Sequence, residues 1–206
     1  MPKLYYTTTS CGAASFIAAA VAGVNLQTEQ VDLGTHKTAS GADYYAINPK
    51  GNVPGLVLDD GTLLNEGAAV LQWIADQAPG KVAPPNGTTQ RYEVQNALNY
   101  IASEVHPSIG HLFYPNNEEI KAYIKSKAAA KLTFLENNLI GDKHFLVGNA
   151  FSIADSYLYI ALSWTQYVGI DLAPYPKVKA YFERIGDLDF VKAAHARMAT
   201  NPATVL

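Results

Sequence analysis

The sequence predicts an α/β domain followed by an all-helical domain. Strand-like and helix-like patterns alternate over residues 3–77, whereas only helical patterns follow from residue 88. Between them, residues 80–87 contain two glycines and two prolines and form the best linker candidate in the chain. We therefore expect one domain over residues 1–79 and a second over residues 88–206.

The first domain is predicted to hold two parallel strands, a hairpin and two helices. Residues 3–6 and 29–33 favour strands, and the alanine-rich residues 13–22 between them favour a helix. A right-handed crossover makes these two strands parallel. Asp59-Asp60-Gly61 marks the turn of a hairpin over residues 56–64, and Asn65 is placed to cap a helix that runs to residue 77. Residues 34–43 are predicted to be a loop, with a short helix near Tyr44.

The second domain shows helical patterns and no convincing strand. The patterns cover residues 88–113, 118–138, 153–168, 176–185 and 188–198. Pro107 interrupts the first of them and predicts a kink. Ser152 and Asp155 have the spacing of a capping box, so we interpret this pair as structural and not catalytic.

Composition excludes several classes of protein. The 206 residues are 49% hydrophobic, enough for one or two packed domains, and the formal charge of −3 argues against nucleic-acid binding. The single cysteine excludes an intrachain disulfide and a multi-cysteine zinc site, and no metal site is expected. No apolar run approaches the roughly 20 residues that span a membrane, and the start lacks a signal core, so a cytoplasmic protein is expected. A charged fraction of only 16% indicates that a partner subunit covers some apolar surface.

Cys11 is the first residue that could carry chemistry. It lies between the first strand and the first helix, where backbone N–H groups and the helix dipole would lower the pKa of its thiol. An unreactive, buried cysteine is the alternative. The hydroxyls of Tyr6, Thr8 and Ser10 lie near the same strand end and compete for the same role.

Two further segments favour a peptide-like ligand. The Val53-Pro54 bond is expected to be trans on sequence alone, but a cis bond would let an extended peptide pair with the Val53 backbone. Glu66 and Gly67 open a helix, whose free N–H groups suit a carboxylate while Glu66 suits an ammonium. An acidic residue that only complements its own helix dipole explains Glu66 equally well.

Asn99 and His106 are candidates in the helical half. They are seven residues apart, which in a regular α-helix places both on one face. A histidine at a helix end without a catalytic role is the alternative. Nucleotide-binding and metalloprotease motifs are absent from the chain.

Together these features resemble a cytosolic glutathione transferase over essentially the whole chain. The resemblance rests on the Cys11 turn, the segment Asn48-Pro49-Lys50-Gly51-Asn52-Val53-Pro54, the Glu66-Gly67 helix start and the S-x-x-D box. Cys11 with Asn99 and His106 is most similar to the bacterial beta class. The resemblance implies a thioredoxin-like first domain that binds glutathione as co-substrate, a helical domain that holds a small electrophile, and a homodimer without another cofactor.

The resemblance also implies roles for individual residues. Val53, before a cis Pro54, would pair with the cysteinyl backbone of glutathione, and Glu66 with Gly67 would bind its γ-glutamyl end. Cys11 and His106 would be catalytic. The remaining predicted substrate-binding residues are Tyr6, Lys37 and Asn99.

The sequence departs from the family pattern at three positions. Gly12 stands where a serine usually follows the cysteine, which removes one hydroxyl donor. His36 stands where a lysine usually contacts the glycyl carboxylate, and the neighbouring Lys37 is the expected substitute. Pro107, just after His106, is also unexpected.

The expected reaction is attack of the glutathione thiolate on an electrophilic carbon. A Cys11 thiol of low pKa would equally support thiol–disulfide exchange through a mixed disulfide with glutathione. A glutathione-dependent isomerase, lyase or dehalogenase is the first alternative. The residues that would distinguish these activities from conjugation line the second domain, and the candidates are Leu112, Phe113, Tyr114 and Tyr167. A non-catalytic glutathione-binding module is the second.

Overall fold

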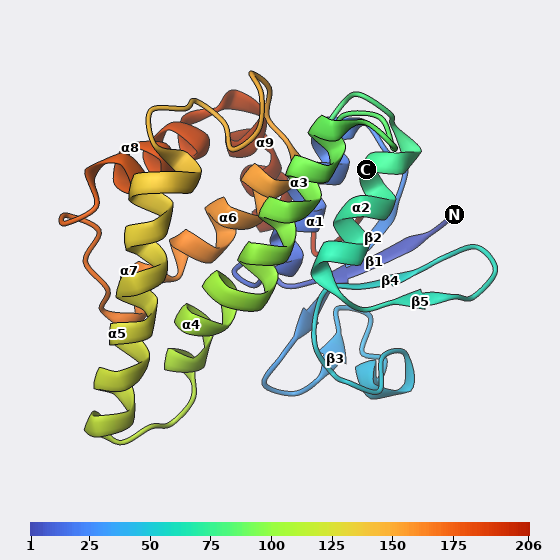
Figure 1. The fold of residues 1–206 in the computed structure, drawn as a ribbon. Coiled ribbons are helices and arrows are strands. Elements are labelled where there is room, and N and C mark those ends of the chain that lie inside the picture. The colour runs from blue at the N-terminus through green and yellow to red at the C-terminus, as the bar shows by residue number, and fades with distance from the viewer. The chain divides into compact units, whose positions relative to one another are not determined.

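The computed structural model describes residues 1–206 as two units. Unit 1 comprises Met1–Asn86 together with Asp189–Leu206, and unit 2 comprises Gly87–Leu188 (Figure 1). The expected division into an α/β part and a helical part is confirmed. The expected second domain of residues 88–206 is not, because the last 18 residues belong to unit 1.

Unit 1 is built on a mixed sheet with strand order β3-β2-β1-β4-β5. The central strands β1 (Lys3–Tyr6) and β2 (Gln27–Asp32) are parallel, with Lys3 opposite Gln27. On the other side of β1, the hairpin strands β4 (Gly55–Val57) and β5 (Leu63–Leu64) add antiparallel pairs. The predicted parallel pair and hairpin are therefore confirmed. The two-residue strand β3 (Lys37–Thr38) lies in the predicted loop, which continues into a short helix at Tyr44–Ala46.

Helix α1 (Gly12–Ala22) is the centre of unit 1. Nine of its eleven residues are buried, and it packs against α2 (Gly67–Gln77) and α9 (Asp189–Thr200). Its many alanines allow this close packing on several sides, since a methyl group holds neighbouring helices at short range. Gly23 ends the helix in the left-handed conformation that glycine adopts without steric cost.

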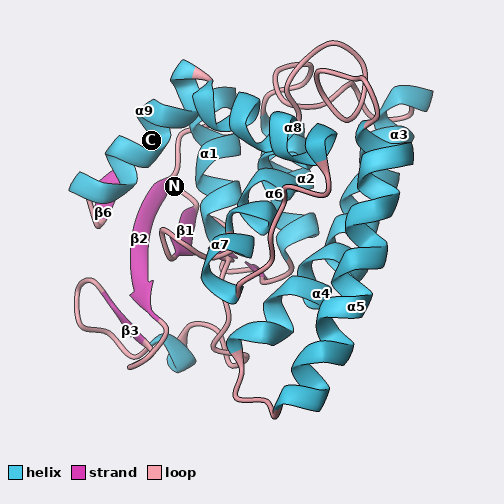
Figure 2. Cartoon of the chain, turned by 90° about the vertical axis from the view of Figure 1, so that its left-hand side faces the viewer, coloured by secondary structure: helices cyan, strands magenta, loops and turns pink.

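The C-terminal segment was assigned wrongly by the sequence pattern. Helix α9 packs on α1, and β6 (Ala203–Val205) pairs antiparallel with β2 over Gln27–Glu29 (Figure 2). The helical pattern of α9 does not reveal which unit it packs against. A strand of only three residues also carries too little alternation to be recognised, yet it satisfies the backbone groups along one edge of β2.

Unit 2 contains four of the five predicted helical segments, some of them divided into shorter helices. The chain descends through α3 and α4 and returns through α5 beside them (Figure 1). Helix α6 is buried over most of its length and packs against α3 and α8. The elements are α3 (Thr89–Tyr100), a π turn (Ile101–Val105), α4 (His106–Gly110), a 3₁₀ turn (His111–Phe113), α5 (Glu118–Phe134), a second π turn (Leu135–Ile140), α6 (Ile153–Ser163), α7 (Thr165–Val168) and α8 (Pro176–Asp187).

The predicted capping box at the start of α6 is confirmed. Asp155 accepts hydrogen bonds from the Ser152 backbone N–H at 2.8 Å and from the Ser152 hydroxyl at 2.7 Å. The same buried carboxylate also accepts from the Leu146 N–H at 2.9 Å and the Tyr181 hydroxyl at 2.7 Å. Asp155 thus joins the start of α6 to the preceding loop and to α8, which is a structural role.

Candidate functional site

Cys11 lies at the N-cap of α1, where β1 turns into the helix. The turn is tight, since a Cβ atom on Gly12 would lie 3.0 Å from Cβ and 3.1 Å from Cα of Tyr6. This close approach leaves little room for a side chain at position 12. The Ser10 hydroxyl is used within the same turn, donating to the Thr7 carbonyl at 3.0 Å and accepting from the Gly12 N–H at 3.2 Å.

The Cys11 thiol lies against the backbone of Val53. Its Sγ donates to the Val53 carbonyl oxygen at 3.0 Å. Burial raises the pKa of the thiol to about 12, and the backbone N–H groups of Cys11 and Gly12 offset this only in part. The expected lowering of the pKa by the helix start is therefore wrong, because desolvation of the thiolate outweighs the hydrogen bonds from the backbone N–H groups there.

Tyr6 is not at the site. Its side chain is fully buried, packs on Phe16 with ring centroids 4.9 Å apart, and its hydroxyl accepts from Gln30 Nε2 at 3.4 Å. Because the side chains of a strand alternate between the faces of a sheet, a tyrosine near the strand end can point into the core. The prediction of Tyr6 as a binding residue is thus corrected to a core role.

The Val53-Pro54 peptide bond is cis, as the family resemblance implied and against the expectation from sequence alone. Val53 precedes β4, whose pairing with β1 begins at Gly55, so the Val53 backbone is not committed to the sheet. Its carbonyl accepts from the Cys11 thiol. This backbone segment and the thiol therefore lie side by side.

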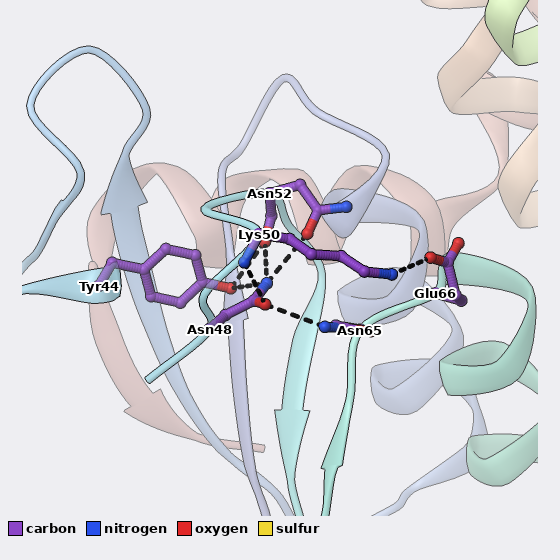
Figure 3. Close-up of polar contacts among 6 residues, drawn as sticks. All are labelled: Tyr44, Asn48, Lys50, Asn52, Asn65 and Glu66. Atoms are coloured by element: carbon purple, nitrogen blue, oxygen red, sulfur yellow. Dashed lines mark hydrogen bonds and ion pairs between the residues drawn. The ribbon is translucent and has the colours of Figure 1, made fainter. Parts of the chain in front are cut away.

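Asn48 holds the loop before Val53 in place, and sequence reasoning gave it no separate role. This fully buried side chain donates from Nδ2 to the Asn52 carbonyl at 2.7 Å and to the Asn52 side-chain oxygen at 3.0 Å (Figure 3). Its Oδ1 accepts from the Lys50 N–H at 3.2 Å and from Asn65 Nδ2 at 3.0 Å. Tyr44 adds a hydroxyl that donates to the Asn52 carbonyl at 2.9 Å. The signal in the sequence was an asparagine opening the turn-rich segment 48–54.

Glu66 is the N-cap residue of α2, in place of the expected Asn65. The Asn65 amide is instead bonded to Asn48, so it is not available to cap the helix. The Glu66 carboxylate makes no cap hydrogen bond either; its Oε1 pairs with Lys50 Nζ at 2.5 Å (Figure 3). This ion pair was not predicted, since residues 16 positions apart carry no local pattern.

His36, and not Lys37, lies against the loop at Gly51. The His36 ring packs on Tyr45 with centroids 4.4 Å apart, and a Cβ on Gly51 would lie 3.1 Å from its Cε1 atom. His36 adopts a positive φ of 50°, and its buried Nδ1 has no hydrogen-bond partner. Lys37 is exposed in β3, opposite Asp32.

In unit 2, His106 lies just after a π turn. The His106 N–H donates to the Ile101 carbonyl, five residues back, and Pro107 has no N–H to continue the ladder. The predicted kink is thus a widened turn. The regular two-turn spacing assumed for Asn99 and His106 is also wrong, because a wide turn lies between them. Asn99 is exposed, whereas His106 is partly buried.

The His106 ring is held by two aromatic side chains of its own unit. Its Nδ1 lies 2.7 Å from the Tyr157 hydroxyl, and its ring meets Trp164 edge-on with centroids 4.7 Å apart. Burial, with a smaller effect of His111, lowers the pKa of His106 to about 4. The imidazole is therefore neutral at pH 7.

The structure also bears on metal binding and on membrane insertion. No group of three or more His, Cys, Asp or Glu side chains is arranged to hold a metal ion. None of the helices combines the length and the apolar character needed to cross a membrane.

Comparison with known proteins agrees with the resemblance seen in the sequence. Family models described as glutathione S-transferase N-terminal and C-terminal domains match residues 11–77 and 98–189. The chain is 38% identical over 195 residues to glutathione S-transferase GstA of Escherichia coli O157:H7, covering 93% of this chain and 96% of that protein. It is also 27% identical to maleylacetoacetate isomerase of Pseudomonas aeruginosa, over 93% of this chain and 90% of that one.

Solved structures give the same result. A sphingomonad glutathione S-transferase complexed with glutathione has a TM-score of 0.89 at 38% identity, over 96% of this chain and 99% of that chain. A beta class glutathione S-transferase of Sphingomonas chungbukensis has a TM-score of 0.87 at 38% identity, over 94% and 97% of the two chains. With this fold, the cis proline loop beside Cys11 and both domain matches, the chain belongs to the glutathione S-transferase family.

Proposed function

We propose that this protein conjugates the glutathione thiolate to small electrophilic molecules. The observation that carries the proposal is the grouping, within unit 1, of the Cys11 thiol and the uncommitted Val53 backbone, which lie 3.0 Å apart. Glu66 lies close enough to raise the pKa of Cys11 by its charge. A thiol, an extended backbone and a carboxylate together suit the cysteinyl and γ-glutamyl parts of glutathione.

The protonated state of Cys11 favours conjugation over thiol exchange. A thiol whose pKa is about 12 has almost no thiolate at pH 7, so it is a poor nucleophile toward a disulfide. The same thiol is a hydrogen-bond donor, as its bond to the Val53 carbonyl illustrates. We propose that the thiol of bound glutathione releases its proton to solvent and that Cys11 turns its own S–H toward the resulting thiolate and stabilises it. The thiolate then attacks the electrophilic carbon, and with an aryl halide the new carbon–sulfur bond replaces the carbon–halogen bond as halide leaves.

Asn99 and His106 are proposed, from the resemblance, to act on glutathione as well. Because His106 is neutral at pH 7, it would act as a hydrogen-bonding group and not as a cation. Its Tyr157 partner at Nδ1 leaves Nε2 for a ligand. A homodimer and a cytoplasmic location are proposed on the same family grounds.

The test is calorimetric titration with glutathione, followed by a conjugation assay with an aryl halide. We expect binding and turnover, with Cys11→Ala lowering kcat and Glu66→Gln raising KM. Binding without turnover would favour the non-catalytic module, and absence of binding would overturn the proposal.

Glutathione-dependent isomerisation is the second candidate. The 27% identity to a maleylacetoacetate isomerase favours it, although that match is weaker than the match to GstA. Isomerisation also uses the glutathione thiolate, but it regenerates glutathione. A cis–trans isomerisation assay with an unsaturated diketo acid, in which glutathione is not consumed, separates it from conjugation.

A further inference from the structure

In this structure the Glu66 carboxylate forms an ion pair with the side-chain ammonium of Lys50. Lys50 Nζ lies 2.5 Å from Glu66 Oε1, and the side chains are 51% and 70% exposed. Both charges are therefore within reach of a ligand from solvent. Glu66 makes no cap hydrogen bond to α2, so opening this pair leaves the start of the helix unchanged.

The backbones that carry the two charges are fixed to each other. The Oδ1 atom of buried Asn48 accepts from the Lys50 N–H and from the Asn65 side chain, which directly precedes Glu66 (Figure 3). The Lys50 side chain can therefore rotate, whereas its backbone stays in place. When the ion pair opens, the positive charge stays beside the carboxylate that it has left.

We propose that Lys50 and Glu66 act as a two-charge clamp that selects the zwitterionic end of glutathione. Glu66 binds the α-ammonium of the γ-glutamyl residue, and Lys50 turns to bind its α-carboxylate. The proposal rests on the proposed function, because it names the residues that recognise one end of that ligand.

The energetics favour a ligand with both charges. Opening an exposed ion pair costs little, and a zwitterion restores a partner to each of the four charges. A ligand that carries only the ammonium would displace Lys50 without giving it a partner, and would leave two positive charges side by side. The repulsion between these two positive charges lowers the affinity for a ligand that lacks the carboxylate.

The experiment compares two ligands on the intact protein by titration calorimetry. One is glutathione, and the other is 4-aminobutyryl-cysteinyl-glycine, which lacks only the α-carboxylate. We expect the wild type to prefer glutathione, with Lys50 contributing a factor of about five, the upper range for an exposed charge pair. In Lys50→Met the preference falls by about that factor, to what the N–H groups at the start of α2 supply, and in Lys50→Arg it is retained.

Lys121→Met is the matched control, because Lys121 also makes an exposed ion pair, with Glu118 on α5. It should keep the wild-type preference. An unchanged preference in Lys50→Met would overturn the clamp while leaving the proposed function intact. Tighter glutathione binding by Lys50→Met would also overturn it, since Lys50 would then only compete with the ligand. Failure of the wild type to bind glutathione would instead overturn the proposed function.

Discussion

Replacing Asn48 by alanine should damage both stability and glutathione binding. Asn48 is fully buried and connects the loop before the cis proline with the start of α2, through bonds to Asn52, Lys50 and Asn65 (Figure 3). Alanine removes all of these bonds at once. It leaves the Lys50 N–H without this acceptor, whereas the Asn52 carbonyl keeps its bond from Tyr44.

The size of the effect follows from the bonds that are lost. With four hydrogen bonds removed at about 1 kcal/mol each, and one carbonyl retaining a partner, we expect a loss of about 3 kcal/mol in the free energy of unfolding. Asn65→Ala removes only one bond of this network and should cost about 1 kcal/mol. The Val53 backbone would also lose order. A loss of about 1.4 kcal/mol in binding corresponds to a tenfold rise in the Kd for glutathione.

Urea denaturation of the two variants and the wild type measures the first effect, and titration calorimetry measures the second. The order of stability should be wild type, Asn65→Ala, Asn48→Ala. If Asn48→Ala matched Asn65→Ala in stability and matched the wild type in Kd, Asn48 would not organise this loop, and the reasoning would be refuted.

Three further predictions concern Cys11, Glu29 and Asp155. Iodoacetamide should label native Cys11 at pH 8 at least about 100-fold more slowly than the unfolded chain, because burial raises the thiol pKa to about 12; equal rates would contradict this. Burial works against the Glu29 carboxylate, but hydrogen bonds from Lys3 and Ser40 hold its pKa at about 2. Its stabilising effect, about 3 kcal/mol, is thus complete above about pH 5 and lost as the pH falls toward 2. Acid denaturation of Glu29→Gln should lack this component, and a wild-type pH profile in that variant would disprove it. Asp155→Ala should lose about 3–5 kcal/mol in urea denaturation, whereas Asp142→Ala, at an exposed ion pair, should lose less than about 1 kcal/mol; equal losses would contradict a structural role.

Much of the fold could be predicted because local signals mark its elements. The alanine-rich run before Gly23 and the Asp-Asp-Gly turn each specify an element through their own residues. Strands β3 and β6 have two and three residues, so no period can be detected in them. They are stabilised by the edge of β2, which is a tertiary effect.

The candidate site could be predicted only in its outline. The motif with Val53, Pro54 and Glu66 was visible because its residues are close in sequence and typical of the family. The bond between Cys11 and Val53 and the pair between Lys50 and Glu66 join residues 42 and 16 positions apart, which the chain reveals only when folded. Roles for Asn99 and His106 stay predictions.

Burial of Cys11 also bears on the identity of the nucleophile. A residue that attacked the substrate itself would need a thiolate, and a helix start with little desolvation would supply one. In this chain the thiol lies against the Val53 carbonyl, and desolvation raises its pKa to about 12. A protonated thiol can donate to a second sulfur without competing with it for the electrophile. This arrangement supports the proposal that the thiolate arrives with the ligand and that Cys11 stabilises it.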